Sequence, residues 1–341
     1  MRNKLCRSFL RCLKIRKALR WCSKLLANKE TIRKEIGSYL PAGIKEKLLK
    51  LPDECYTKLE EIRIRAAKPL QLRIGEEDYG LSLRAELVKD LCESYIVTAD
   101  DVFRILASIS DNSLYAFEEE IRRGFITIPG GHRVGLAGQV ILQGNEVKTI
   151  KDFSGICFRV AREVKDCART IIPQICVGSK GTPVNTLIIS PPRCGKTTIL
   201  RDLARLLSTG SKQGGAQNVV IIDERSEIAG CYRGVPQLEV GPRTDVLDAC
   251  PKALGMMMAI RSLSPQVLIT DEIGSREDLQ AINDCVNAGV ALISSIHAKN
   301  LDDIKKRPQL NQLLNTGVFK TLVVLSRRSG PGRVEEIISL G

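Results

Sequence analysis

One segment of the sequence constrains the fold more than any other: the eight residues 190–197, which read SPPRCGKT. An apolar run, NTLII, precedes this segment, and a run with helical periodicity, TILRDLARLL, follows it. A loop that ends in Gly-Lys-Thr between a buried strand and the start of a helix is the arrangement that cradles phosphate groups. The segment therefore predicts an α/β fold that binds a nucleotide.

Each part of this loop has a predicted role. Lys196 should reach the β- and γ-phosphates of ATP, and the Thr197 hydroxyl should bind Mg²⁺. Ser190 stands where the usual pattern has glycine, at the end of the strand, where a small side chain should fit. Backbone N–H groups should bind the remaining phosphate oxygens. The predicted nucleotide-binding residues are Ser190, Pro191, Pro192, Arg193, Cys194, Gly195, Lys196, Thr197 and Thr198.

Two adjacent acids follow another apolar run further along the chain. Residues 267–270 read VLIT, and Asp271 and Glu272 come directly after them. In phosphate-loop enzymes a carboxylate at the end of a strand holds the Mg²⁺, so we assign Asp271 to the metal. The adjacent Glu272 is the candidate to orient or deprotonate the attacking water.

A third cluster, residues 223–227, reads DERSE and follows the apolar run 219–222. Because open α/β sheets bind ligands at the carboxyl ends of their strands, these acids should lie at the same edge as the phosphate loop. Glu224 or Glu227 could polarise the water, and the sequence does not decide between them. The alternative is an acidic cluster at the start of a helix.

A histidine and three arginines complete the candidate site. His297 follows the apolar run 290–295 and could sense the γ-phosphate or link it to a neighbouring subunit. Phosphoryl transfer also uses positive charge, often an arginine from a neighbour. Arg225, Arg243 and Arg261 lie in or near these segments, and spacing alone does not identify which of them acts.

The pattern around the loop predicts two domains. From residue 185 apolar runs alternate with helical periodicity, which is typical of a parallel sheet covered by helices. The predicted strands are 185–189, 218–222, 266–270, 290–295 and 318–325, with 333–340 as a possible edge strand. We therefore predict an ATPase domain at 185–341, a linker at 177–184 and a mixed α+β domain at 31–176.

Within residues 31–176 the predictions are less regular. A helix is expected over 30–50, and Thr98 followed by Asp101 predicts a capped helix start. Strands are expected at 59–65, 70–74, 125–128, 133–138, 139–142 and 155–160.

The basic character of the chain is concentrated in residues 1–30. The net charge is +13, and this arm alone contains ten lysines and arginines against one glutamate. It should form an amphipathic helix that lies on an anionic membrane surface or on an acidic partner, the alternative being a solvated helix. The rest of the chain is only slightly basic, which makes nucleic acid an unlikely partner.

Two further features bear on location. The chain has no apolar run of about 18 residues and no secretory signal, so we expect a cytoplasmic protein. Its twelve cysteines include no Cys-x-x-Cys pair, so most should be small buried apolar residues in a reducing compartment.

The order of these motifs resembles the secretion ATPase superfamily of type II and type IV machines. In that superfamily a phosphate loop is followed by an acidic box, a strand-end box with glutamate and a histidine box. These correspond here to 190–197, 223–227, 271–274 together with the upstream Arg261, and 296–298. The resemblance implies an α/β fold with a RecA-like P-loop NTPase C-terminal domain and a smaller α+β N-terminal domain. It also implies a homo-oligomer, a hexamer, with ATP bound between subunits.

A closer resemblance is to the stage III sporulation protein AA family of endospore-forming bacteria. The segments VVIIDERSEIAG, VGPRTDVLD, VLITDEIG, GHRVGLAGQ and FSGICFRVAREV carry it, together with the phosphate loop. The resemblance implies an ATPase of the mother cell that powers membrane-embedded channel proteins at the forespore membrane. The protein would then be cytoplasmic or peripheral to that membrane. Residues 1–30 lie outside the resemblance, so their role stays open.

Two other functions are compatible with the motifs. One is a nucleic-acid-dependent ATPase or translocase, although only 4% of residues are aromatic, which leaves few platforms for base stacking. The other is a nucleotide switch or scaffold that does not hydrolyse ATP. Turnover that disappears in Lys196→Ala and Glu272→Gln proteins would exclude the second of these.

Overall fold

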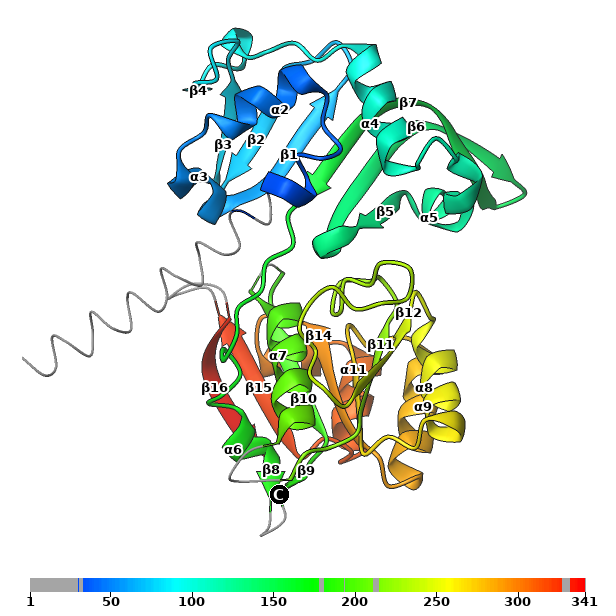
Figure 1. Ribbon diagram of the computed structural model, residues 1–341. Coiled ribbons are helices and arrows are strands. Elements are labelled where there is room, and N and C mark those ends of the chain that lie inside the picture. Colours follow the sequence, from blue (N-terminus) through cyan, green and yellow to red (C-terminus); the bar gives the residue numbers. More distant parts are fainter. Residues whose placement is uncertain are drawn as a thin grey trace, which may run out of the picture. The chain divides into compact units, whose positions relative to one another are not determined.

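The computed structural model describes residues 30, 33–177, 181–192, 194–210, 215–326 and 332–340. Except for residue 30, the predicted arm lies outside this part of the chain, as does Arg193. The chain forms two compact units, Met1–Arg162 and Glu163–Gly341 (Figure 1). Within the described residues, none of the helices has the length and apolar character needed to cross a bilayer.

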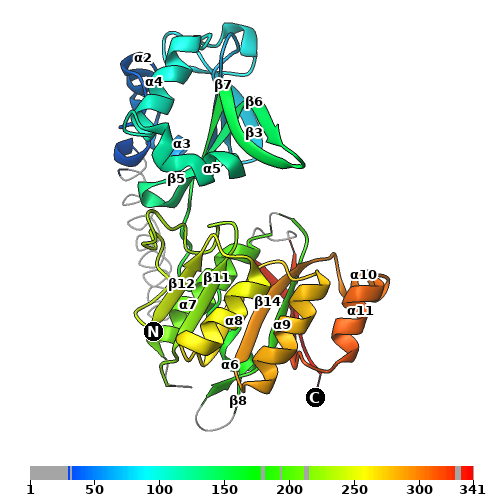
Figure 2. The same ribbon diagram turned by 90° about the vertical axis from the view of Figure 1, so that its right-hand side faces the viewer.

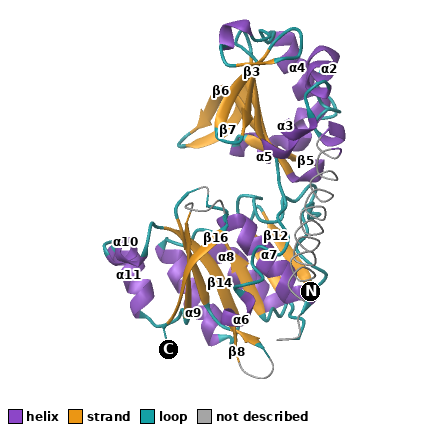
Figure 3. Cartoon of the chain, turned by 90° about the vertical axis from the view of Figure 1, so that its left-hand side faces the viewer, coloured by secondary structure: helices purple, strands orange, loops and turns teal. Residues whose placement is uncertain are grey.

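The first unit is built on a seven-stranded antiparallel sheet with the order β4-β3-β2-β1-β7-β6-β5. Its helices gather on one face of this sheet, as Figure 3 shows. The strands are β1 (Leu59–Arg65), β2 (Gln71–Ile74), β3 (Glu77–Leu81), β4 (Leu87–Val88), β5 (Phe125–Ile128), β6 (His132–Gln143) and β7 (Glu146–Arg159), and the helices are α2 (Ala42–Leu49), α3 (Asp53–Lys58), α4 (Ala99–Ile109) and α5 (Glu118–Arg123).

Alternation of side chains explains this single covered face. In β1, Ile62 and Ile64 are buried, whereas Arg63 and Arg65 are partly exposed on the other face. Side chains alternate between the two faces of a strand, so only one face can contribute to the apolar core. The helices close this core with their own apolar side chains, for example Ile44 of α2 and Ile105 of α4.

Several predictions for this unit can be compared directly with the structure. The predicted strands 59–65 and 125–128 are confirmed with the same bounds. The capped start of α4 is also confirmed, because Thr98 and Asp101 bond to each other's backbone N–H groups. The predicted strands 133–138 and 139–142 are one continuous strand, β6, and the prediction missed β3, whose sequence EDYGL is too polar to stand out.

The second unit contains a sheet with the order β12-β11-β13-β14-β10-β15-β16. Its strands are parallel except for the edge strand β16. The strands are β10 (Thr186–Ser190), β11 (Val219–Asp223), β12 (Thr244–Asp248), β13 (Val267–Thr270), β14 (Ala291–His297), β15 (Thr321–Ser326) and β16 (Arg333–Ser339). The larger helices are α7 (Lys196–Thr209), α8 (Lys252–Ser262), α9 (Arg276–Asn287) and α11 (Pro308–Asn315).

This sheet is buried on both faces, which explains its uninterrupted apolar strands. Ile188 of β10 packs in a core with side chains of α7, whereas its neighbours Leu187 and Ile189 pack in a second core with side chains of α8 and α9. Figure 2 shows α8 and α9 lying over the sheet. A strand covered on both faces needs apolar residues at consecutive positions, as the runs in the sequence indicated.

The two units divide earlier in the chain than the expected linker at 177–184. The division follows Arg162, and the segment after it belongs to the second unit. Ala168, Ile171 and Ile175 are fully buried in the same core as α7, so this segment cannot belong to the first domain. The stretch expected to be a linker contains a small hairpin, β8 (Cys176–Val177) and β9 (Thr182–Pro183), with residues 178–180 outside the described part.

Candidate nucleotide-binding site

The phosphate loop joins the centre of the sheet to the first turn of α7. β10 ends at the buried Ser190, and α7 begins at Lys196. Gly195 has a φ of 82°, a left-handed conformation that favours glycine, so the glycine of the motif is needed for the turn. The first N–H groups of a helix have no partner within the helix, and they favour an anion at this end. The geometry therefore suits a phosphate group.

Two contacts anchor the loop itself. The backbone N–H of Gly332, just before β16, donates to the carbonyl oxygen of Cys194 at 2.7 Å. The Ser190 hydroxyl donates to the carbonyl oxygen of Pro191 at 2.8 Å. Ser190 is thus satisfied locally at the position where the usual pattern has glycine. Pro192 lies in the loop, and the next residue, Arg193, is outside the described residues.

Three predicted site residues meet in one cluster. Lys196, which is 7% exposed, donates from Nζ to Oε1 of Glu272 at 2.9 Å. Nε2 of His297 lies 3.2 Å from the same Nζ and 2.5 Å from the same carboxylate oxygen. His297 ends β14 directly opposite Ser190 in the parallel ladder, which explains why the two motifs are adjacent.

Of the three candidate arginines, Arg225 is the one whose contacts reach this cluster. Its Nη1 lies 3.2 Å from the second carboxylate oxygen of Glu272. Arg243 precedes β12 and donates to the carbonyl oxygen of Ala216, at the amino edge of the sheet. Arg261 lies in the last turn of α8, about 13 Å along the helix from its first residue. Arg225 therefore supplies positive charge within the chain itself.

The charges in the cluster shift the pKa values of its members in opposite ways. Burial lowers the pKa of Lys196, and the bond to Glu272 opposes this shift. Burial alone would raise the pKa of Glu272, but the bond to Lys196 and the nearby charges of His297 and Arg225 hold it below its usual value. Glu272 is therefore ionised at neutral pH and is surrounded by positive charge.

Asp271 and Thr197 occupy positions that fit a bound Mg²⁺. Asp271 is 3% exposed, and its Oδ1 has no hydrogen-bond partner in the part of the chain that the structure describes. Burial raises the pKa of Asp271, and the negative charges of Glu272 and Glu227 add to this effect. A bound cation would satisfy the orphaned oxygen and restore the ionised form.

Thr197 lies one residue after Lys196, in the first turn of α7. Thr198 follows it in the same turn, so both threonines lie at the amino-terminal end of α7. Within the described residues, no group of three His, Cys, Asp or Glu side chains is arranged to hold a metal alone. The Thr197 hydroxyl and the Asp271 carboxylate are oxygen donors, the kind of ligand that Mg²⁺ prefers, and would hold this ion.

The acidic cluster after β11 separates into residues with different environments. Asp223 is fully buried, and its two oxygens accept the N–H groups of Glu227 and Ala229, both at 2.8 Å. Burial raises the pKa of Asp223 to about 6 despite these bonds. Glu224 instead forms an ion pair with Lys252, the first residue of α8.

Sequence reasoning missed three residues of the site region. Lys252 pairs with Glu224, and the buried Arg201 of α7 binds carbonyl oxygens of the acidic loop. Arg307 donates to the carbonyl oxygen of His297 at 2.8 Å and to Asp303 at 3.2 Å. None of the three belongs to a recognisable motif, and only the fold brings each to its partner.

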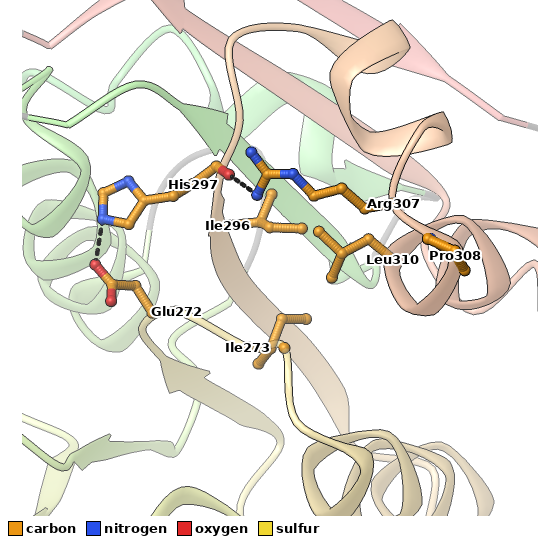
Figure 4. A pocket seen from close by; sticks show the side chains of 8 residues that line it. Glu272, Ile273, Ile296, His297, Arg307, Pro308 and Leu310 are labelled. Carbon is orange, nitrogen blue, oxygen red and sulfur yellow. Dashed lines mark hydrogen bonds and ion pairs between the residues drawn. The ribbon is translucent and has the colours of Figure 1, made fainter.

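A hollow of about 510 Å³ opens beside Glu272 and His297 (Figure 4). In this view Arg307 bonds to the backbone of His297 from one side, while Glu272 meets the imidazole from the other. The remaining lining residues are Ile273, Gly274, Ile296, Pro308 and Leu310. Glu272 and His297 therefore line a hollow whose other lining residues are mostly apolar.

Known proteins resemble this chain in fold and in sequence. The solved structure of the ATPase DotB of Legionella pneumophila resembles the chain with a TM-score of 0.54 and 12% identity, and the match covers 84% of this chain and 76% of that one. The pilus retraction motor PilT with bound ADP resembles it with a TM-score of 0.51 and 13% identity, and the match covers 82% of this chain and 76% of that one. Likeness at such low identity shows the fold alone. It confirms the predicted RecA-like α/β fold.

The sequence comparisons are more specific. The family model described as "Sporulation stage III, protein AA" matches residues 30–340. The stage III sporulation protein AA of Bacillus subtilis (strain 168) is 45% identical over 304 residues, which cover 89% of this chain and 94% of that protein. With its phosphate loop, strand-end acids and histidine arranged as described above, the chain belongs to the stage III sporulation protein AA family.

Proposed function

We propose that this chain is an ATPase that hydrolyses MgATP to drive conformational work, as the motor subunit of a secretion-like or channel-like complex required for endospore formation. The observation that carries the proposal is the bond between Lys196 of the phosphate loop and Glu272, which follows the buried Asp271 with its orphaned carboxylate oxygen. A cation, an ionised carboxylate and a buried metal-ligand candidate are the groups that phosphoryl transfer to water requires.

The contacts suggest how these residues divide the work. The N–H groups of α7 and the ammonium of Lys196 bind the phosphates, and Thr197 and Asp271 would hold Mg²⁺, which would supply positive charge to the phosphate oxygens. Lys196 exchanges its carboxylate partner for phosphate when ATP binds. Glu272, released from Lys196, is then free to orient the attacking water or accept its proton.

The assembly of this motor is also part of the proposal. Subunits form a homo-oligomer, a hexamer, with ATP between neighbours and Arg225 or a neighbour's arginine at the γ-phosphate. Domain closure on nucleotide is the work step. The partners are membrane-embedded channel proteins, and the protein works from the cytoplasm on the mother-cell side of the forespore membrane. Residues 1–30 contact the anionic membrane surface.

The decisive test compares wild-type protein with a Lys196→Ala variant. We expect wild-type protein to bind MgATP and release phosphate steadily, and the variant to lose binding or turnover, because the phosphates lose their buried cation. An exposed lysine on the same unit, Lys305, provides the control as Lys305→Ala. Full activity in Lys196→Ala would contradict the proposal.

The same assay separates the alternative functions. Hydrolysis stimulated by DNA, with a steep dependence on salt, would favour a nucleic-acid translocase. Tight binding of ATP without turnover, with or without membranes, would favour a nucleotide switch. Turnover that rises as the oligomer assembles supports the motor.

A further inference from the structure

The further question, which rests on the proposed function, is which carboxylate of the acidic loop 224–229 acts at the site and what holds it there. Glu224 already has a cationic partner, because Lys252 forms an ion pair with it and is only 11% exposed at its side chain. This ion pair ties the Glu224 carboxylate to the first residue of α8. Glu224 is therefore better suited to fastening the loop to α8.

Glu227 has a different environment. The loop that carries Glu227 leaves β11 beside the end of β13, because Ile222 lies opposite Thr270 in the parallel ladder, and Asp271 follows Thr270 directly. The charge of Glu227 accordingly acts on both Lys196 and Asp271.

The backbone next to Glu227 is strained, because Ser226 has a φ of 52°. The peptide groups around Glu227 must therefore be held in place for its carboxylate to keep one position. Strained backbone persists where the surroundings hold it in place.

Two buried charged side chains bind the peptide groups of residues 227–229. Asp223 accepts the N–H groups of Glu227 and Ala229. Arg201 donates to the carbonyl oxygens of Glu227, at 2.8 Å, and of Ile228. Backbone N–H groups of residues 227–229 thus bond to a carboxyl group, and backbone carbonyl oxygens of the same segment bond to a guanidinium. Hydrogen bonds to charged groups are stronger than those between neutral groups.

Arg201 also links this loop to the phosphate loop. It lies on α7 one turn beyond Thr197, and only 6% of its surface is exposed. Helical residues four apart lie on the same side of the helix, so the guanidinium approaches the acidic loop from beside the first turn. The helix that begins at the phosphates therefore carries the residue that fixes the acidic loop.

We propose that Arg201 and Asp223 are positioning residues that clamp residues 227–229 and so aim the Glu227 carboxylate at Lys196 and Asp271. Glu227, rather than Glu224, is then the acidic-loop residue that acts at the reacting phosphate. The clamp makes the placement of this carboxylate depend on α7.

The test uses Arg201→Lys, which keeps the charge but replaces a two-pronged donor with a single nitrogen. We expect kcat to fall about 10- to 100-fold, in line with the cost of misplacing a catalytic group, while the dissociation constant for MgATP stays unchanged. The matched control is Arg169→Lys, because the Arg169 side chain is 72% exposed. Thermal unfolding of each variant confirms that it is folded.

A double variant decides whether Arg201 acts through Glu227. If it does, adding Arg201→Lys to Glu227→Gln lowers kcat no further than Glu227→Gln alone. Effects that multiply would overturn the proposal, as would a larger loss from Glu224→Gln than from Glu227→Gln. If Arg201→Lys does not fold, Asp223→Asn takes its place in the same cycle.

Amide hydrogen exchange keeps this inference separate from the proposed function. The amides of residues 227–229 should exchange faster in the Arg201→Lys protein, and this result requires no turnover. Exchange that is unchanged would refute the clamp even in an active enzyme. A wild-type protein that does not hydrolyse ATP but shows faster exchange in the variant would refute the proposed function and leave the clamp standing.

Discussion

Replacing Glu272 with glutamine should uncouple nucleotide binding from turnover. In the described structure the Glu272 carboxylate bonds to Lys196 at 2.9 Å, to His297 at 2.5 Å and to Arg225 at 3.2 Å. ATP must compete with this carboxylate for Lys196. The variant removes the competing charge and keeps the shape of the side chain.

The size of the effect follows from the burial of the pair. The Lys196 and Glu272 side chains are 7% and 24% exposed, so solvent screens their interaction only partly. A hydrogen bond to a charged group contributes about 1.5–3 kcal/mol, equivalent to roughly a 10- to 100-fold change in affinity. Glutamine still accepts a bond from Lys196, so we expect MgATP to bind about 10-fold more tightly.

Turnover should change in the opposite direction. Loss of a general base or water-orienting carboxylate lowers kcat by about 10²- to 10⁴-fold. Titration calorimetry with MgATP and a phosphate-release assay measure the two quantities on one preparation. The exposed Glu336 of β16 provides the control as Glu336→Gln, which should change neither.

The reasoning fails if Glu272→Gln binds MgATP no more tightly than wild-type protein. In that case the contact with Lys196 would not compete with phosphate. Turnover near the wild-type rate would separately remove Glu272 from the chemistry.

Three further predictions test other parts of the molecule. Asp223→Asn should flatten the pH dependence of stability, because burial raises the pKa of Asp223 from 3.8 to about 6 and the stability that this shift provides at low pH is lost as the pH rises. Wild-type protein should lose about 2 kcal/mol of unfolding free energy relative to the variant between pH 4 and pH 7, measured by urea unfolding. Leu200→Ala should cost about 2–5 kcal/mol of unfolding free energy because Leu200 is fully buried against the sheet, whereas Leu254→Ala, at a residue that is 57% exposed, should cost much less; equal losses would contradict the assignment of the core. Deleting residues 1–30 should weaken sedimentation with anionic vesicles and leave ATP hydrolysis intact, and unchanged sedimentation would remove the membrane role of the arm.

Local patterns in the sequence were sufficient to predict the phosphate loop and the sheet around it. The strand before Ser190, the glycine at 195 and the helix after Lys196 are neighbours in the chain, so their spacing alone fixes their geometry. The carboxyl ends of parallel strands meet at one edge, which brought Glu272 and His297 to Lys196 as expected.

The partners of the acidic loop could not be predicted in this way. Lys252 and Glu224 are 28 residues apart, and no periodic pattern links them. Arg201 looks like any arginine on an amphipathic helix until the loop 224–229 is folded against it. The early division after Arg162 depends likewise on Ala168 and Ile171 packing under α7, which is a tertiary event.

The register of β10 with β14 has a consequence for how fast the site can respond. Ser190 and His297 are neighbours in a hydrogen-bonded ladder, so their backbones cannot separate unless the sheet opens. Any exchange of partners around Lys196 must then occur by rotation of side chains, which at the 41% exposed His297 takes picoseconds to nanoseconds. When a phosphate binds Lys196, the imidazole of His297 can therefore change its hydrogen-bond partner before a helix moves, because helix motions take microseconds or longer.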